Sequence, residues 1–152
     1  MPARESVKSS LSPSAYRQLA EFRFQIRQFL HFSEEAARAH GIEPQQHQLM
    51  LAIKALPAGM RPTVTVISSR LCLRHHSTVE LINRLVERGA ATRRHSDQDR
   101  REVLVELTPQ GEELLQELSA LHWNELQTSG PALSSALHAI LHPGPRERRR
   151  LA

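Results

Sequence analysis

The hydrophobic pattern of this chain changes its period near residue 90 and changes back near residue 108. Before residue 90, apolar residues recur every three or four positions, which predicts helices. The four predicted helices cover residues 12–40, 44–56, 63–71 and a stretch that ends at Gly89. Residues 102–107 are then rich in strand-forming residues and follow residues 90–95 across the polar connector Ser96-Asp-Gln-Asp99. This arrangement predicts a β-hairpin.

The helical period returns at Thr108. A break is predicted at Gly130-Pro131, because proline lacks the N–H that a helix interior needs, and residues 133–141 then form a last helix. Helices, a hairpin and a long helix in this order are typical of a winged helix-turn-helix flanked by terminal helices. We therefore expect a mainly α fold with a small β-hairpin wing (α+β).

The composition indicates the cellular compartment that such a chain would occupy. Its 152 residues carry a formal net charge of +4 and a single cysteine, Cys72. One cysteine excludes a disulfide framework and favours a reducing cytosol. No apolar run approaches the roughly 20 residues of a membrane span. We expect a soluble, cytoplasmic protein of one domain with no membrane contact.

Residues 71–89 have the two faces that a DNA-recognition helix needs. Thr78, Leu81, Ile82 and Leu85 are spaced i, i+3, i+4 and i+7 and form an anchoring stripe. The opposite face carries the side chains that we expect to read base edges in a major groove, namely His75, His76, Val79, Glu80 and Asn83. An ordinary solvated helix would show the same pattern, so this stretch alone leaves both interpretations open.

The hairpin connector and its flanks hold four arginines around the only two aspartates of the chain. These residues are Arg93, Arg94, Arg100, Arg101, Asp97 and Asp99. A hairpin tip that bears arginine can enter a narrow minor groove, where the negative potential is concentrated. We expect the aspartates to shape the turn and to hold the arginines. The alternative is an ordinary solvated loop. The position of the hairpin directly after a helix-turn-helix pattern favours DNA binding.

Three consecutive motifs carry a family resemblance. They are Thr63-Val through Leu71-Cys-Leu73, Leu81-Ile-Asn-Arg-Leu85 with Glu87-Arg-Gly89, and Asp97-Gln-Asp-Arg-Arg101 running into Val103-Leu-Val-Glu-Leu-Thr-Pro-Gln-Gly111. The last, an acidic and basic wing followed by a strand and Leu-Thr-Pro-x-Gly, is the most specific. Together they resemble the MarR family of bacterial transcription regulators over about residues 44–118.

The resemblance implies a homodimer that binds palindromic double-stranded DNA operators and is usually released by a small ligand or an oxidant. Residues 1–142 would form a single MarR-like domain, and residues 143–152 a basic tail. The dimerisation helices would be 12–40 and 109–142, and the winged helix-turn-helix 44–108. We therefore expect a ligand-responsive repressor. The alternative is a winged-helix dimer that binds a protein partner and no DNA.

The family's residue roles transfer onto positions of this sequence. Arg100 resembles the wing-tip arginine that enters the minor groove, and Arg101 its structural or phosphate-contacting neighbour. The phosphate-contact candidates are Arg74, Arg84 and Arg94. Two positions depart from the family pattern and leave the operator sequence undetermined. Cys72 stands where glycine often occupies the helix-turn-helix turn, and His75-His76 replaces the more usual short polar pair.

The start of the recognition helix can be placed in two ways. Ser77-Thr-Val-Glu80 is a capping box, which would start the helix at Ser77. The resemblance starts it near Arg74 instead. We favour the earlier start, because it directs the anchoring stripe inward.

Other chemistry is weakly supported. Cys72 could sense oxidants, but the relatives that do so use a cysteine near the N-terminal helix, so we expect a small buried hydrophobe. His138 and His142 are spaced i, i+4, yet no third ligand is evident, and no metal is expected. Without a phosphate-binding glycine loop or a nucleophile motif, we expect neither an enzyme nor a cofactor.

All four phenylalanines lie in the first predicted helix, and no aromatic residue falls between residues 33 and 122. This distribution argues against readers of single strands, which stack bases on aromatic side chains. A dimer or core seam is the simpler interpretation of the cluster. The alternative is that Phe22 and Phe29 line a pocket for a small aromatic or amphipathic effector.

Charge is strongly segregated along the chain. Residues 61–101 hold nine basic and four acidic residues, whereas residues 102–142 hold six acidic residues and no Lys or Arg. A basic segment is the electrostatic requirement for binding phosphates. The charge pattern therefore places the expected DNA contacts in residues 61–101.

Overall fold

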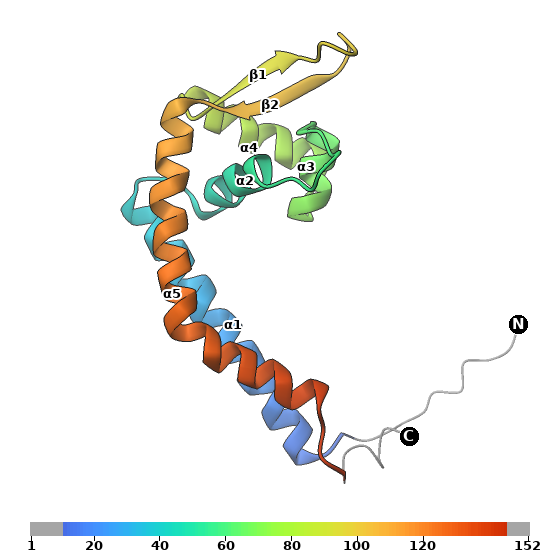
Figure 1. Ribbon diagram of the computed structural model, residues 1–152, viewed down its shortest axis with the longest axis vertical. Coiled ribbons are helices and arrows are strands. Elements are labelled where there is room, and N and C mark those ends of the chain that lie inside the picture. The colour runs from blue at the N-terminus through green and yellow to red at the C-terminus, as the bar shows by residue number, and fades with distance from the viewer. Residues whose placement is uncertain (1–10, 146–152) are drawn as a thin grey trace, which may run out of the picture. The chain divides into compact units, whose positions relative to one another are not determined.

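The computed structural model describes residues 11–145 (Figure 1). Its elements, in chain order, are α1 (Pro13–Ala39), α2 (Pro44–Lys54), α3 (Val64–Leu71), α4 (His75–Glu87), β1 (Ala91–His95), β2 (Val103–Leu107) and α5 (Pro109–Leu141). The predicted mainly α fold with one hairpin is confirmed. Within the described range, no helix has the length and apolar character needed to cross a membrane.

The chain divides into two compact units. The central unit is Ser33–Trp123, and the terminal unit consists of the residues up to Phe32 and those from Asn124 onward. Helices α1 and α5 contribute to both units. Of the basic tail expected at residues 143–152, positions 146–152 lie outside the described residues.

The core of the central unit lies where α2, α3, α4 and the hairpin meet the start of α5. Its fully buried apolar side chains include Leu49, Met50, Ile67, Ile82, Leu85, Val105 and Leu118. Each buried side chain of this size contributes about 1.5–3 kcal/mol through removal from water. All four residues of the predicted stripe on α4 are buried, so the period of three and four correctly identified the inward face.

Helix α4 begins at His75, with Arg74 in the extended conformation of an N-cap. The backbone N–H and the hydroxyl of Thr78 both donate to the Arg74 carbonyl, at 3.0 and 3.1 Å. The helix therefore starts in the register that the family resemblance implies. The capping box at Ser77 lies inside the helix and does not start it.

The hairpin is antiparallel, with Ala91 opposite Leu107 and His95 opposite Val103. Its inner side packs on the core through Val105, which is fully buried, and the neighbouring Leu104, also buried, faces the other side of the hairpin. The connector before α3 joins its edge, because the Val105 N–H donates to the Pro62 carbonyl at 2.9 Å. The wing is thus attached to the helix-turn-helix through the backbone.

The first turn of α5 packs directly against the turn between α4 and β1. Thr108 donates from its N–H to the Ala90 carbonyl (3.1 Å) and from its hydroxyl to the Gly89 carbonyl (2.6 Å). A Cβ on Gly111 would lie 2.9 Å from the carbonyl carbon of Ala90 and closer still to its oxygen. Glycine is therefore required at position 111 by close packing within a helix.

The predicted break at Gly130-Pro131 is wrong, because α5 continues through Pro131 to Leu141. A proline removes one N–H from a helix, which can be tolerated where the neighbouring turns remain bonded. In the turn before Pro131, the hydroxyl of Ser129 donates to the Glu125 carbonyl (3.0 Å) and that of Thr128 to the Asn124 carbonyl (3.3 Å), and neither replaces the single bond that Pro131 cannot make. The separate last helix predicted for 133–141 is the end of α5.

In the terminal unit, the first part of α1 lies beside the end of α5 (Figure 1). A cavity of about 270 Å³ there is lined by Ser14, Arg17, Gln18, Glu21, Ala136 and Ala139. Phe22 and Phe29 are half-buried and line no part of this cavity. The unit also exposes large apolar side chains, among them Tyr16, Phe24, Leu137 and Leu141.

Candidate nucleic-acid interface

The outward face of α4 is polar and accessible. His75, His76, Glu80 and Asn83 are exposed, and Val79 is half-buried. They lie opposite the buried stripe that anchors the helix. A helix held on one side and exposing short polar groups on the other has the form needed for insertion into a major groove.

Asn83 is connected to the hairpin. The Arg93 guanidinium on β1 donates to Oδ1 of Asn83 at 2.6 Å. Because a guanidinium can only donate, the amide must turn its oxygen toward Arg93 and its NH₂ away from it. The bond therefore orients the amide of Asn83 and leaves its NH₂ group and one lone pair of its oxygen for a ligand.

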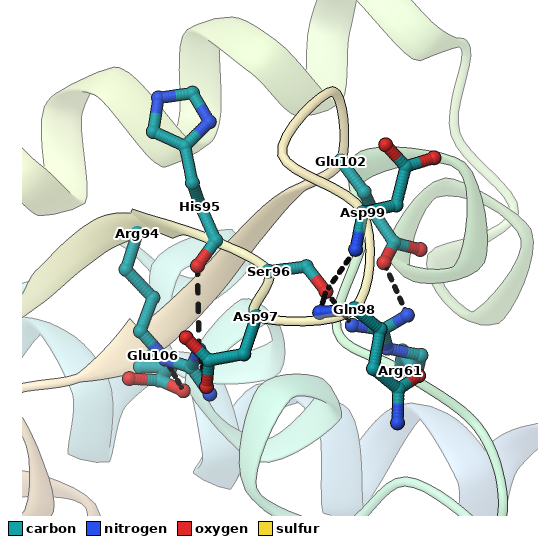
Figure 2. A network of polar contacts seen from close by, with 9 residues as sticks. All are labelled: Arg61, Arg94, His95, Ser96, Asp97, Gln98, Asp99, Glu102 and Glu106. Carbon is teal, nitrogen blue, oxygen red and sulfur yellow. Dashed lines mark hydrogen bonds and ion pairs between the residues drawn. The ribbon is translucent and has the colours of Figure 1, made fainter.

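The wing turn, residues 96–102, is organised around Ser96 (Figure 2). Ser96 is only 2% exposed, and its Oγ accepts from the N–H groups of Gln98 (3.1 Å) and Asp99 (3.3 Å). Asp99 accepts from the Arg101 N–H through Oδ1 and from the Glu102 N–H through its carbonyl, both at 2.9 Å. Arg100 and Arg101 are exposed on this turn.

Arg94 differs from the other phosphate-contact candidates. Its Nε donates to Glu106 at 2.6 Å, and Asp97 lies 3.6 Å from its Nη1. The hydrogen bond that Arg94 donates to Glu106, together with the charge of that carboxylate, raises the pKa of Arg94. Arg74 and Arg84 are exposed. A phosphate would have to compete with Glu106 for Arg94.

Arg61, in the connector before α3, was not among the residues predicted from the sequence. One Nη donates to Ser96 Oγ, and the other lies 2.5 Å from Oε2 of Glu102 (Figure 2). Ser96 is 35 positions away in the sequence. No local motif indicates such a contact, so only the fold reveals it.

The expectation that Cys72 is a buried hydrophobe is wrong, because Cys72 is exposed. It ends α3 in the left-handed conformation, with φ of 53°, and its N–H donates to the Ser69 carbonyl at 3.2 Å. This is the position at which the family often has glycine. The backbone requirement of the turn, and not the apolar character of the side chain, determines where Cys72 points.

A pair of histidines in the central unit was also missed. His47 is 4% exposed, its ring centroid lies 4.5 Å from that of His122, and neither of its nitrogens has a hydrogen-bond partner. Burial, followed by the proximity of His122, lowers the pKa of His47 to about 4. His47 is therefore neutral at pH 7.

The described part of the chain contains no group of three or more His, Cys, Asp or Glu side chains placed to hold a metal ion. His138 and His142 do meet, with their rings stacked 4.1 Å apart. The i, i+4 spacing of these two histidines therefore produces a ring contact on α5.

Comparison with known proteins supports the fold and the family resemblance. The model of the MarR family matches residues 40–102, which confirms the resemblance suggested by the motifs. No curated protein matches the sequence.

Solved structures of MarR type share the fold. One MarR family transcription regulator is 18% identical, with a TM-score of 0.68 over 84% of this chain and 82% of that chain. A mutant of S. aureus MepR bound to an oligodeoxyribonucleotide is 17% identical, with a TM-score of 0.59 over 86% of each chain. BpsR of Bordetella bronchiseptica, whose DNA binding is regulated by 6-hydroxynicotinic acid, is 20% identical, with a TM-score of 0.60 over 78% of this chain and 86% of that chain.

Proposed function

We propose that this chain, whose residues 40–102 match the model of the MarR family, is a transcriptional regulator that binds specific double-stranded DNA sequences. The observation that carries the proposal is the orientation of α4, which buries its apolar stripe and exposes the face predicted to read bases. That MepR was solved with an oligodeoxyribonucleotide supports DNA as the partner. The function is regulatory and cytoplasmic, and it needs neither catalysis nor a cofactor.

In this proposal α4 enters the major groove, where His75, His76, Val79 and Glu80 contact base edges. Asn83 contributes its NH₂ group as a donor, and its amide oxygen, which accepts from Arg93, keeps a second lone pair. Adenine is read by asparagine through a donor and an acceptor together, and the bond from Arg93 orients the amide that would offer them.

The wing carries the second contact. Arg100, with Arg101 beside it, enters the adjacent minor groove, where a narrow A·T-rich groove concentrates negative potential. Arg74 and Arg84 contact phosphates, and Arg94 does so only if it is released from Glu106. Asp97 and Asp99 shape the turn that presents the arginines.

We propose that the chain acts as a homodimer. The exposed apolar side chains of the terminal unit, which include Tyr16, Phe24 and Leu141, supply surface for such an interface. A symmetric dimer presents two copies of α4 and therefore favours a palindromic operator. A ligand that changes the spacing of the two helices would release the DNA.

The regulation of BpsR by 6-hydroxynicotinic acid supports a small aromatic effector here as well. We propose repression relieved by such a molecule, with Phe22 and Phe29 as candidate contacts. Fluorescence anisotropy of a bound operator, titrated with small aromatic acids, tests this part of the proposal. Release of the operator by one of them is expected, and no release by any would argue against an aromatic acid as the effector.

Selection of bound sequences from a pool of random duplexes tests DNA recognition itself. A palindrome is expected, with half-sites separated by about one helical turn of roughly 34 Å. Binding to the selected duplex should weaken steeply as salt is raised. If no palindrome is enriched, and no duplex is bound at low salt, the proposal is refuted and a protein partner is favoured.

A further inference from the structure

We propose that Arg61 is a positioning residue that fixes the wing turn against the helix-turn-helix, so that the wing arginines are held in place before DNA arrives. The inference rests on the proposed DNA-binding function for its purpose. The contact itself is independent of DNA. It joins two segments of the central unit that are distant in sequence, the connector before α3 and the wing turn.

Hydrogen bonds to the hairpin and to the start of α3 hold the connector that carries Arg61 in place. Its Pro62 carbonyl accepts from the Val105 N–H of β2 at 2.9 Å. Its next residue, Thr63, is the N-cap of α3 and accepts from the Val66 N–H at 3.3 Å. Arg61 therefore extends from a backbone that is bonded both to the hairpin and to the helix-turn-helix.

The target of Arg61 is the neck of the wing turn. The turn closes where the Ser96 N–H donates to the Glu102 carbonyl at 2.9 Å. Arg61 reaches the side chains of both these residues, the first and the last of the turn (Figure 2). A single guanidinium thus bridges the two ends of the segment that carries Arg100 and Arg101.

The two contacts of Arg61 differ in kind. Glu102 meets Arg61 as an ion pair, with its Oε2 2.5 Å from the guanidinium. The side chains are 35% and 28% exposed, which screens the pair less than on an open surface. At Ser96, Arg61 adds a charged donor to the hydroxyl that already accepts from Gln98 and Asp99.

This arrangement prepares the wing for binding. Two strands of five residues form a hairpin that is marginal by itself in water. A turn ordered in advance has less conformational freedom to lose when its arginines enter a groove. A lysine could keep the charge near Glu102 but could not span both partners, because its ammonium is a single point.

Hydrogen–deuterium exchange of the full chain without DNA tests the contact directly. In Arg61→Ala, the amides of Gln98, Asp99 and Glu102 should exchange about ten-fold faster than in the wild type. Arg61→Lys should give an intermediate rate. Arg88→Ala is the matched control, because Arg88 donates to the Gly41 carbonyl, away from the wing, and should leave these amides unchanged.

Two outcomes would overturn the inference. One is unchanged exchange in the wing turn of Arg61→Ala. The other is an equal rise in the buried amides of α2 and α4, which would show that Arg61 contributes to overall stability and not to the position of the wing. If Arg61→Ala does not fold, Arg61→Lys carries the same comparison.

A double-mutant cycle on the selected operator tests the purpose of the contact. Arg61→Ala alone should weaken binding about ten-fold, and it should add no further loss in the Arg100→Ala background, because both changes remove the same wing contact. Full additivity would mean that Arg61 acts separately from the wing and would refute its positioning role. If the wild type binds no duplex, the proposed function fails, and the exchange experiment still decides whether Arg61 fixes the turn.

Discussion

Replacing Gly111 by alanine should destabilise the chain, because the added Cβ would meet the backbone of Ala90. It would lie 2.9 Å from the carbonyl carbon, whereas carbon atoms in contact are about 3.5–4.0 Å apart. The first turn of α5 and the turn after α4 must therefore separate by about half an ångström or more. Thr108 is bonded across this junction to Ala90 at 3.1 Å and to Gly89 at 2.6 Å, so both bonds are strained or lost.

The expected cost follows from these contacts. Two weakened hydrogen bonds cost about 1 kcal/mol each, and forcing a group into a rigid backbone contact costs about 1–3 kcal/mol. The higher helix propensity of alanine returns about 1 kcal/mol. The free energy of unfolding of Gly111→Ala should therefore fall by about 2–4 kcal/mol.

Gly130→Ala is the matched control, since it makes the same change in the same helix. Apart from its chain neighbours and the backbone of its own helix, no atom lies within 4 Å of the position that its Cβ would take. The gain in helix propensity is partly offset because position 130 precedes Pro131, so its stability should stay within about 1 kcal/mol of the wild type. Denaturant unfolding at one fixed protein concentration measures both variants. If Gly111→Ala is as stable as Gly130→Ala, the reasoning about the Ala90 contact is wrong.

Three further predictions follow from other sites. Cys72→Gly should raise the free energy of unfolding by about 0.5–1 kcal/mol, because glycine adopts the left-handed conformation without steric cost but gains freedom in the unfolded chain; a lower denaturation midpoint would contradict this. The stability of the wild type should fall as the pH drops below 6.5, because the folded pKa of His47, about 4, lies below the unfolded value and the unfolded chain binds more protons. The loss should reach about 3 kcal/mol at pH 4, and His47→Leu should flatten the profile; identical profiles for the two chains would refute the assignment. Arg100→Ala should weaken binding about ten-fold on operators with A·T-rich flanks and less on G·C-rich flanks, and equal losses measured by anisotropy would argue against minor-groove insertion.

Much of the fold was predictable because its information is local. The change from a period of three and four to a strand-forming run located the hairpin to within one residue of the observed β1 and β2. The start of α4 was decided by the position of Thr78 and the stripe that follows it. Burial of an apolar face outweighed the capping preference of Ser77, so the competing local signal did not determine the structure.

The remaining errors and omissions concern residues whose roles depend on tertiary contacts. The proline rule predicted a break at Pro131, but hydroxyl bonds in the preceding turn accompany an uninterrupted α5. The burial of Cys72 was predicted from the apolar character of its side chain, whereas its left-handed backbone conformation determines its exposure. The sequence did not single out Arg61 and His47. The residues that they contact, Ser96 and His122, are distant from them in the sequence.

The contact at Gly111 also limits how the chain can change. The obstacle to a larger residue is a carbonyl oxygen and its carbon, which every amino acid at position 90 possesses. No side-chain substitution at position 90 can therefore make room for a Cβ. Suppressors selected from Gly111→Ala chains should be revertants or substitutions elsewhere that raise stability as a whole. Once this glycine is lost, the sequence has no local compensating change available to it.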